Sequence, residues 1–346
     1  MKKTATFCGI ALSLSLALSC SPGKGSRVDE LMSEMTLDEK IGQLNVLVAP
    51  HGDVTGSVMS RNVLEKVQGS AVGSLFGLHD KELLKEWQRV AVEESRLGIP
   101  LLFGADVIHG YRTTFPVPIG LAATWNPGLM EKTARIMASE ASSDGIDWLY
   151  APMVDISRDG RWGRCVEGAG EDPYLGSVYA SAMVRGIQGN LEEADEILAC
   201  FKHFALYGAV EAGRDYRETD MSLARMYNEY FPPYRAAVEA GAASVMTSFN
   251  DVNGMPSSGN RWLLEDLLRS QWGFDGVVVS DYNAVGELVR HGLGDLAEAS
   301  ALALSAGTDM DMMSEGYVKT LRTQIEAGAI PLSYVDAACR RVLAIL

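Results

Sequence analysis

Short apolar runs alternate with segments of helical periodicity along most of the chain. Continuous apolar runs are typical of parallel strands that are buried on both faces of a sheet. The clearest runs span residues 99–105, 148–154, 197–201, 243–247, 277–280 and 307–312, and weaker candidates span residues 42–48 and 72–76. The repeated strand–helix–strand order predicts right-handed crossovers and a parallel α/β sheet.

The segments between these runs have recognisable helix ends. The segment 261–272 is an example, because Asn260 is a candidate N-cap and Gly273 a candidate stop. Six to eight such units in one chain favour a closed (β/α)8 TIM-like barrel over an open doubly wound sheet. No glycine-rich phosphate loop follows any of the apolar runs, which argues against a nucleotide-binding sheet. No linker divides the chain from residue 28 onward, so we expect residues 28–346 to form one barrel domain.

The N-terminus has the layout of a secretion signal. Two lysines precede an apolar stretch, residues 5–19, that ends in small residues before Cys20. We expect residues 1–20 to be a signal peptide whose Cys20 is lipidated, as in bacterial lipoproteins, and residues 21–27 to be a tether. Ala17 stands where such signals usually carry Leu, so ordinary cleavage near Ser19 is the alternative. Both alternatives predict export through the inner membrane, to the periplasm or the outer membrane. A lipid on Cys20 would be the only attachment to a membrane.

The charge of the chain and its cysteine and histidine content indicate which substrates, metals and cofactors are expected. In 346 residues, 45 acidic against 30 basic side chains give a formal net charge of −15, which disfavours nucleic acid and favours a neutral or cationic substrate. Beyond the signal, Cys165, Cys200 and Cys339 are too few and too widely spaced for a disulfide framework or a zinc site. The five histidines are scattered, so we expect no metal, and no motif signals a cofactor.

Polar residues follow directly after five of the apolar runs. In a parallel barrel, these positions share the C-terminal rim, where active sites are built. The residues are Asp106, Asp155, Lys202 with His203, Asn250 with Asp251, and Asp281. Each also has a structural interpretation, such as a helix cap for Asp281 or a partner of Arg158 or Arg161 for Asp155. Lys202 is the hardest to explain structurally, because a lysine in an apolar wall needs a partner or a purpose.

Several motifs in order resemble glycoside hydrolase family 3, in particular its periplasmic β-glucosidases. They are GADVIHG (104–110), FPVPIGLA (115–122), APMVDISRDGRWGR (151–164) with Glu167 and GEDPY (170–174), KHF (202–204), NGMP (253–256) and WGFDGVVVSDY (272–282). The resemblance extends from about residue 28 to the end of the chain. It implies a (β/α)8-like first domain, irregular in some members, and a retaining, exo-acting β-glycosidase.

The resemblance also assigns roles to individual residues. Asp281 matches the catalytic nucleophile. Tyr282 would flank the entrance and stack on the next sugar. The residues that would bind sugar hydroxyls are Asp106, Arg164, Lys202 and His203, whereas Arg161, Glu171 and Asp172 would brace loops. The chemistry agrees, because a retaining glycosidase needs an ionised nucleophile, and a nearby Lys or Arg lowers a carboxylate pKa.

The chain is expected to depart from the family after its last residues, where the family's second domain would follow. The family's acid/base is usually a Glu in a second, α/β sandwich domain, and the apolar face of a last helix, predicted to start at a Ser333 cap, runs to Leu346 without a stop. We therefore expect a truncated chain that lacks this domain and leaves the acid/base unassigned. Phe249 stands where many members have a substrate-contacting Tyr. A branch with an acid/base His after its Lys-His pair is disfavoured, because no such histidine follows His203.

The leading hypothesis is a retaining β-glucosidase that removes terminal non-reducing β-D-glucosyl residues from oligosaccharides or glucosides through a covalent glycosyl-aspartate. One alternative is a glycan-binding or inactive domain without the acid/base. A second is a Schiff-base aldolase, because Lys202 at a strand end is a sensible place for an imine-forming amine.

Overall fold

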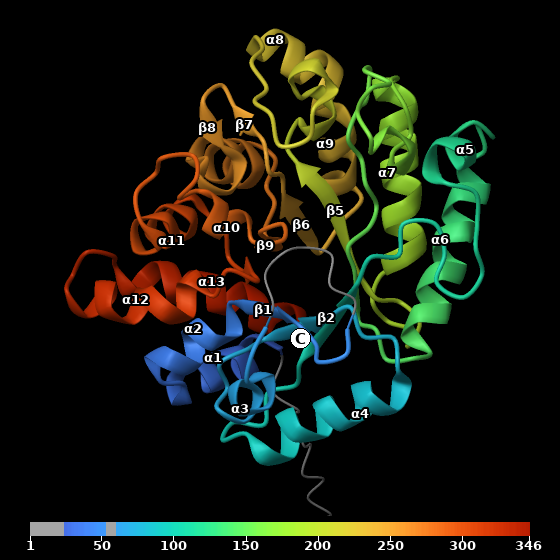
Figure 1. The fold of residues 1–346 in the computed structure, drawn as a ribbon. Coiled ribbons are helices and arrows are strands. Elements are labelled where there is room, and N and C mark those ends of the chain that lie inside the picture. The colour runs from blue at the N-terminus through green and yellow to red at the C-terminus, as the bar shows by residue number, and fades with distance from the viewer. Residues whose placement is uncertain (1–23, 53–59) are drawn as a thin grey trace, which may run out of the picture.

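A barrel of eight parallel strands forms the centre of the molecule (Figure 1). The computed structural model describes residues 24–52 and 60–346. The strands are β1 (Asn45–Val48), β2 (Ser74–Phe76), β3 (Leu102–Ala105), β4 (Trp148–Leu149), β5 (Leu198–Phe204), β6 (Ser244–Thr247), β9 (Val277–Val279) and β10 (Asp311–Met312). Their order is β10-β1-β2-β3-β4-β5-β6-β9, and a parallel bridge between Val279 and Met310 joins the two ends. The predicted (β/α)8 barrel is therefore confirmed.

Helices follow the strands and form the outer layer (Figure 1). The longer ones are α1 (Lys24–Glu34), α2 (Leu37–Gln43), α4 (Lys81–Arg89), α6 (Pro127–Ser142), α7 (Pro173–Gln188), α9 (Pro232–Glu239), α11 (Leu296–Ala306), α12 (Gly316–Glu326) and α13 (Leu332–Ile345). Shorter ones are α3 (Val63–Gln68), α5 (Pro118–Ala122), α8 (Leu223–Arg225) and α10 (Ala284–Glu287). A two-stranded hairpin, β7 (Asp251–Val252) with β8 (Met255–Pro256), stands apart from the barrel sheet.

Every strand of the barrel falls within or against a predicted apolar run, with two changes in length. β4 ends at Leu149, although the run continues to Val154, because Pro152 has no N–H to give to a ladder. Pairing resumes at Met153, which bridges to Lys202. β5 extends three residues beyond its run, and this extension carries Lys202 and His203 within the strand.

Two helix ends test the caps predicted from the sequence, and one of the two predictions is confirmed. Residues 262–271 form a π-helix whose first turn is capped by Asn260, since its Oδ1 accepts the Leu263 N–H at 3.2 Å. Gly273 follows with φ +72°, a conformation that glycine adopts without strain. The prediction of a Ser333 cap is wrong: α13 starts at Leu332 after Pro331, and Ser333 lies inside its first turn. Pro331 is favoured there because its fixed φ suits the entry to a helix.

The first helix and the terminal segments bear on the predicted domain boundaries. α1 begins at Lys24, inside the segment 21–27 that the sequence assigns to a tether. Its neighbour α2 is tied to α13 by the Lys40–Asp336 ion pair at 2.8 Å. The predicted signal peptide, Cys20 included, lies outside the described residues.

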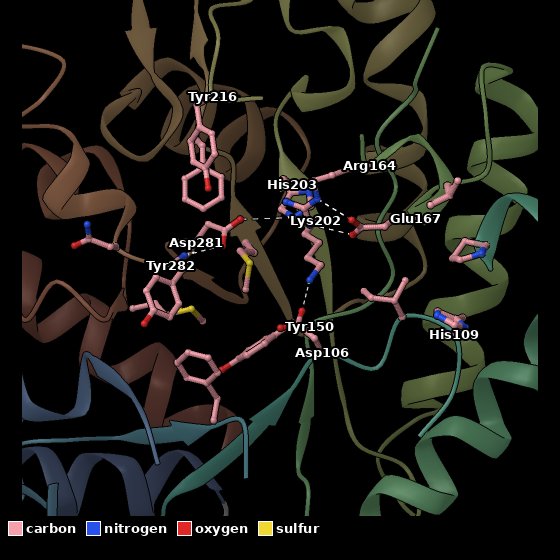
Figure 2. Close-up of a pocket in the computed structure, with 18 of the residues that line it drawn as sticks. Asp106, His109, Tyr150, Arg164, Glu167, Lys202, His203, Tyr216, Asp281 and Tyr282 are labelled. Atoms are coloured by element: carbon pink, nitrogen blue, oxygen red, sulfur yellow. Dashed lines mark hydrogen bonds and ion pairs between the residues drawn. The ribbon is translucent and has the colours of Figure 1, made fainter. Parts of the chain in front are cut away.

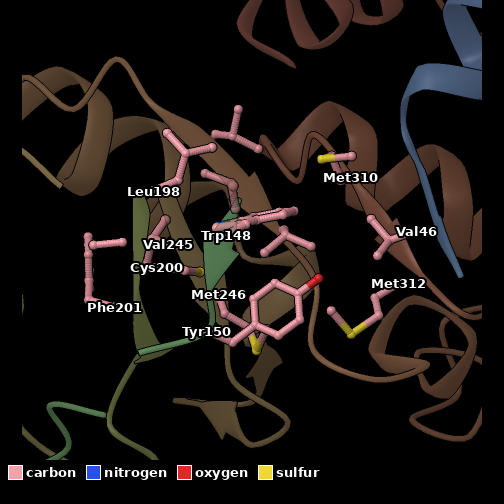
Figure 3. Close-up of a cluster of buried hydrophobic side chains, with 14 of the residues drawn as sticks. Val46, Trp148, Tyr150, Leu198, Cys200, Phe201, Val245, Met246, Met310 and Met312 are labelled. Atoms are coloured by element: carbon pink, nitrogen blue, oxygen red, sulfur yellow. The ribbon is translucent and has the colours of Figure 1, made fainter. Parts of the chain in front are cut away.

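Side chains fill the inside of the barrel (Figure 3). Trp148 is fully buried there, and its indole N–H donates to Ser244 Oγ at 2.7 Å. Gly104 on β3 makes room for a second ring, because a Cβ at this position would lie 2.2 Å from Tyr150 Oη. Burial raises the pKa of the Cys200 thiol to about 12, so this cysteine is a structural, unreactive one. The barrel interior is therefore a packed core and not an open pore.

Candidate active site

A pocket of about 550 Å³ opens at the C-terminal ends of the barrel strands (Figure 2). Four of the residues predicted from strand ends line it: Asp106, Lys202, His203 and Asp281. Arg164 and Tyr282, which the family resemblance added, line it as well. These six residues therefore meet in one place, whereas the other strand-end candidates, Asp155, Asn250 and Asp251, do not line the pocket.

Asp281 lies just beyond β9 with its side chain 12% exposed. Its Oδ1 accepts the Tyr282 N–H at 2.7 Å, whereas Oδ2 is buried and has no hydrogen-bond partner among the described residues. Oδ2 lies 3.6 Å from His203 Nε2. Asp281 is not the cap of α10, because Asn283 occupies that position. The helix-cap interpretation of Asp281 is therefore wrong.

Burial raises the pKa of Asp281 to about 6, although the charges of Arg164 and Lys202 act to lower it. Desolvation penalises the charged form, and the two cations recover part of that penalty. The result is a carboxyl group that is ionised at neutral pH yet poorly solvated. Such a group suits a nucleophile, because few hydrogen bonds must break before it attacks.

Lys202 is buried and is paired with a carboxylate. Its side chain is 4% exposed and forms an ion pair with Asp106 at the end of β3, whose side chain is 43% exposed (Figure 2). The two residues come from strands separated by β4 in the barrel order. The pair presents one positive and one negative group to the floor of the pocket, a suitable set for binding neighbouring sugar hydroxyls.

His203 is held by a buried network. Its backbone N–H and its Nδ1 both lie 2.9 Å from Asp155 Oδ2, and Tyr234 donates its hydroxyl to Asp155 Oδ1 at 2.5 Å. Burial raises the pKa of Asp155 to about 6, whereas these hydrogen bonds act to lower it. Burial, and then the charges of Arg164 and Lys202, keep the pKa of His203 far below its ordinary value.

We assign the neutral imidazole with its proton on Nδ1. In that tautomer, Nε2 accepts from Arg164 Nη2 at 3.0 Å and turns toward the pocket. The expectation that Asp155 pairs with Arg158 or Arg161 is wrong, because Arg158 pairs with Glu229 and Arg161 with Asp159. The bridge between Met153 and Lys202 brings the segment of Asp155 alongside β5, where Asp155 accepts the backbone N–H of His203.

Arg164 is positioned by Glu167, which lies three residues further along the chain. Glu167 accepts two hydrogen bonds from Arg164, at 2.8 and 3.0 Å, and also lines the pocket. Burial opposes the ionisation of Glu167, but the paired guanidinium outweighs it and the pKa is lowered. The same pairing raises the pKa of Arg164 despite the cost of burial. The pair is therefore a fixed cation with its counter-ion, and Glu167 is a poor proton donor.

The mouth of the pocket is aromatic. Tyr282 packs edge-on against Phe76 with ring centroids 6.1 Å apart. Tyr216 and Glu287 also line this part of the site, and sequence reasoning missed both. Neither follows an apolar run, so no pattern marked them. Asn250 does not reach the pocket: its amide donates to the Ala205 carbonyl and to Thr219, and it stabilises the surrounding loops.

Among residues 24–52 and 60–346, no group of three or more His, Cys, Asp or Glu is arranged to hold a metal ion. No helix in the same ranges is long and apolar enough to cross a membrane.

Comparison with known proteins decides the family. Residues 36–345 match the family described as the glycosyl hydrolase family 3 N terminal domain. The chain belongs to glycoside hydrolase family 3. It is 42% identical over 320 residues to a periplasmic β-glucosidase of Salmonella typhimurium, covering 91% of this chain and 41% of that protein. It is also 37% identical over 285 residues to a β-xylosidase of Formosa agariphila, covering 76% of this chain and 39% of that protein.

Solved structures of family 3 members agree with the fold. A β-glucosidase from Listeria innocua in complex with isofagomine superposes with a TM-score of 0.89 at 40% identity. The match covers 92% of this chain and 45% of the Listeria protein. The chain thus spans less than half the length of the curated relatives described above. The family resemblance predicted from the motifs is confirmed.

Proposed function

We propose that this family 3 chain carries the nucleophile half of a retaining, exo-acting β-glycosidase site. The observation that supports this most is Asp281 Oδ2, a buried carboxylate oxygen without a hydrogen bond in the described chain, in the same pocket as Lys202, Arg164 and His203. A carboxylate so placed can attack a neutral electrophile more readily than a solvated one. The surrounding cations keep it ionised at neutral pH.

In the proposed reaction, Asp281 Oδ2 attacks the anomeric carbon of a β-glycoside. The bond between that carbon and the leaving-group oxygen breaks, and the oxygen departs with the electron pair. Water then attacks the anomeric carbon from the opposite face and gives a proton to the base, the glutamate of a second domain, or to solvent. The bond between that carbon and Asp281 breaks, which frees the carboxylate and gives a β-configured sugar. Asp106, Lys202, His203 and Arg164 would bind the ring hydroxyls during both steps.

The proposal leaves the acid/base with a glutamate of a second domain, as the family resemblance implies. Glu167 lies in the pocket but is unsuited, because its ion pair with Arg164 keeps it ionised. A leaving group that is stable as an anion needs no proton, so the nucleophilic half can be tested by itself.

For the substrate, we propose a terminal β-D-glucosyl residue. The relatives include both β-glucosidases and β-xylosidases. Solved forms of the Listeria β-glucosidase include complexes with glucose and with laminaribiose. Glucose and xylose differ by one hydroxymethyl group, so matched glucoside and xyloside substrates measure the preference directly.

The test uses 2,4-dinitrophenyl β-glucoside and two forms of the chain. The unaltered chain should release dinitrophenolate in a burst and then form β-configured glucose slowly, because the proposal assigns activation of the attacking water to the glutamate of a second domain. Asp281→Gly should release almost none, and added azide should restore release. Azide would attack the face that the carboxylate occupied and give α-glucosyl azide. Equal release from both forms without azide would contradict the proposal, and so would failure of the unaltered chain to release dinitrophenolate.

The two alternatives have distinct signatures. A glycan-binding domain would bind glucose but release no dinitrophenolate. An aldolase would need the Lys202 amine free to attack a carbonyl carbon, whereas this amine is engaged by Asp106. Borohydride reduction in the presence of a carbonyl substrate would trap an adduct on Lys202 only in the aldolase.

We also propose that residues 1–20 direct export and that Cys20 carries a lipid, which would place the protein in the periplasm or on the outer membrane. The supporting observations are the basic start, the short apolar centre and the small residues before Cys20. The similar Salmonella protein is named periplasmic. Labelling with radioactive palmitate should mark the chain and not Cys20→Ser. Equal labelling of both, or of neither, would remove the lipid from the proposal.

A further inference from the structure

Tyr216 occupies an unusual position at the mouth of the pocket. Its ring lies against Phe249, with centroids 4.6 Å apart, and edge-on to Tyr207 at 6.4 Å. Tyr216 packs on these two rings, yet it remains 52% exposed and lines the pocket. In Figure 2 the rings of Tyr216 and Tyr282 lie on opposite sides of Asp281.

The backbone of Tyr216 is held in the left-handed region, at φ +64°. A bulky residue costs free energy there, and such residues gather where function fixes them. Glycine or asparagine would adopt this turn more readily. The local sequence thus keeps a tyrosine at a position where its backbone favours smaller residues, and the side chain faces the pocket.

A carboxylate accompanies this ring. Glu287, the last residue of α10, lines the same part of the pocket with its side chain 21% exposed. Its charge acts on the Tyr216 hydroxyl, together with that of Asp281, and adds to the effect of burial in raising the tyrosine pKa. Arg290 forms an ion pair with Glu287 at 3.9 Å, which is too long for a hydrogen bond.

We infer that Tyr216 and Glu287 form a subsite for the leaving group and select a sugar over an apolar aglycone. This inference rests on the proposed function, since it assigns the residues beyond the bond that Asp281 breaks. The aromatic face would cover the C–H face of the second sugar ring, as aromatic side chains do for apolar surfaces. Glu287 would accept hydrogen bonds from that ring's hydroxyls, which an apolar aglycone cannot supply.

The test is calorimetric and needs no turnover. Glucose reports the deep pocket alone. Thiocellobiose, whose sulfur bridge resists hydrolysis, measures binding to the deep pocket together with a second sugar ring. Phenyl 1-thio-β-glucoside measures binding to the deep pocket together with an apolar ring. The quantity of interest is the affinity of each two-ring ligand relative to glucose for the same variant. The full chain and each variant are first compared by urea unfolding to show that they fold alike.

Tyr216→Asn is the main variant, because asparagine tolerates the left-handed backbone. We expect its relative affinity for thiocellobiose to fall about fivefold to tenfold, in the range of aromatic face contacts, with glucose changed less than twofold. Tyr216→Phe keeps the face and should stay within twofold. Tyr174→Ala is the matched control, because Tyr174 is 77% exposed and does not line the pocket.

Glu287→Gln separates the two parts of the subsite. It should weaken thiocellobiose about threefold to tenfold, as expected for hydrogen bonds to a charged acceptor, and leave phenyl thioglucoside unchanged. Equal losses for glucose and thiocellobiose in Tyr216→Asn, or no loss for either, would overturn the inference. So would unaltered protein that binds thiocellobiose no better than glucose. Azide rescue of Asp281→Gly judges the proposed function independently, because it depends on the deep pocket.

Discussion

Replacing Asp281 by Asn should stabilise the folded protein at neutral pH. The carboxylate is buried, Oδ2 has no hydrogen bond in the described chain, and burial raises its pKa from 3.8 to about 6. Above both values, the folded state therefore carries a charge that it holds less well than the unfolded chain does. The difference corresponds to about 3 kcal/mol at pH 7.5, as an upper bound on the gain from the neutral amide.

The sign with pH follows from linkage. Because the folded pKa is raised, the penalty is complete above pH 6 and fades as pH falls toward 3.8. Urea unfolding should show Asp281→Asn more stable by about 1–3 kcal/mol at pH 7.5, and by about 1 kcal/mol or less at pH 4.5. The amide oxygen can still accept the Tyr282 N–H, so the local backbone is preserved.

Asp309→Asn is the opposing control. Asp309 is buried too, but it accepts hydrogen bonds from Arg269 and Arg341, both at 2.7 Å. Removing its charge takes from Arg341 the carboxylate at 2.7 Å and leaves Arg269 with Glu265 alone, at 3.5 Å, so it should destabilise the protein by about 3 kcal/mol at pH 7.5. The reasoning would be refuted if both variants lost stability equally, or if the gain in Asp281→Asn did not depend on pH.

Three further predictions concern the site and its support. Tyr234→Phe should lower the free energy of unfolding, measured in urea, by about 1–3 kcal/mol, because the Tyr234 hydroxyl donates a hydrogen bond to the buried carboxylate of Asp155. Tyr179→Phe should change it little, since that buried hydroxyl has no partner in the described chain. Gly104→Ala should cost about 1–3 kcal/mol by pushing aside a tyrosine in the barrel, whereas Gly163→Ala meets nothing within 4 Å and should be neutral in the same assay. Lys202→Met should raise the pKa of Asp281 further, because it removes a cation that lowers this pKa. The pH midpoint for covalent labelling of Asp281 by an activated 2-fluoroglucoside should therefore move above 6, and an unmoved midpoint would contradict the coupling.

The barrel and most of the site could be predicted because one rule governs both. Parallel strands read as apolar runs, and their carboxyl ends meet on one rim. That rule predicted a shared rim for Asp106 and Lys202, and the structure shows that they form an ion pair there. It also placed His203 and Asp281 in the same pocket.

The contacts that sequence reasoning missed depend on details that no pattern encodes. One interpretation paired Asp155 with a nearby arginine, but in the structure it contacts His203 of β5 and Tyr234 of α9. Tyr216 and Glu287 reach the pocket from a loop and from the end of a short helix. Loop and short-helix positions carry no periodicity, so their side-chain directions follow from tertiary packing alone.

The most direct test of the account is to map a covalent adduct on Asp281. The chain is incubated with 2,4-dinitrophenyl 2-deoxy-2-fluoro-β-glucoside, its intact mass is recorded, and the modified peptide is identified. The activated leaving group departs without a proton, and the fluorine slows hydrolysis of the intermediate. We predict one fluoroglucosyl unit on Asp281 and none on Asp281→Asn. Folded protein that gains no adduct, or carries it on another residue, would contradict the assignment of Asp281 as the nucleophile.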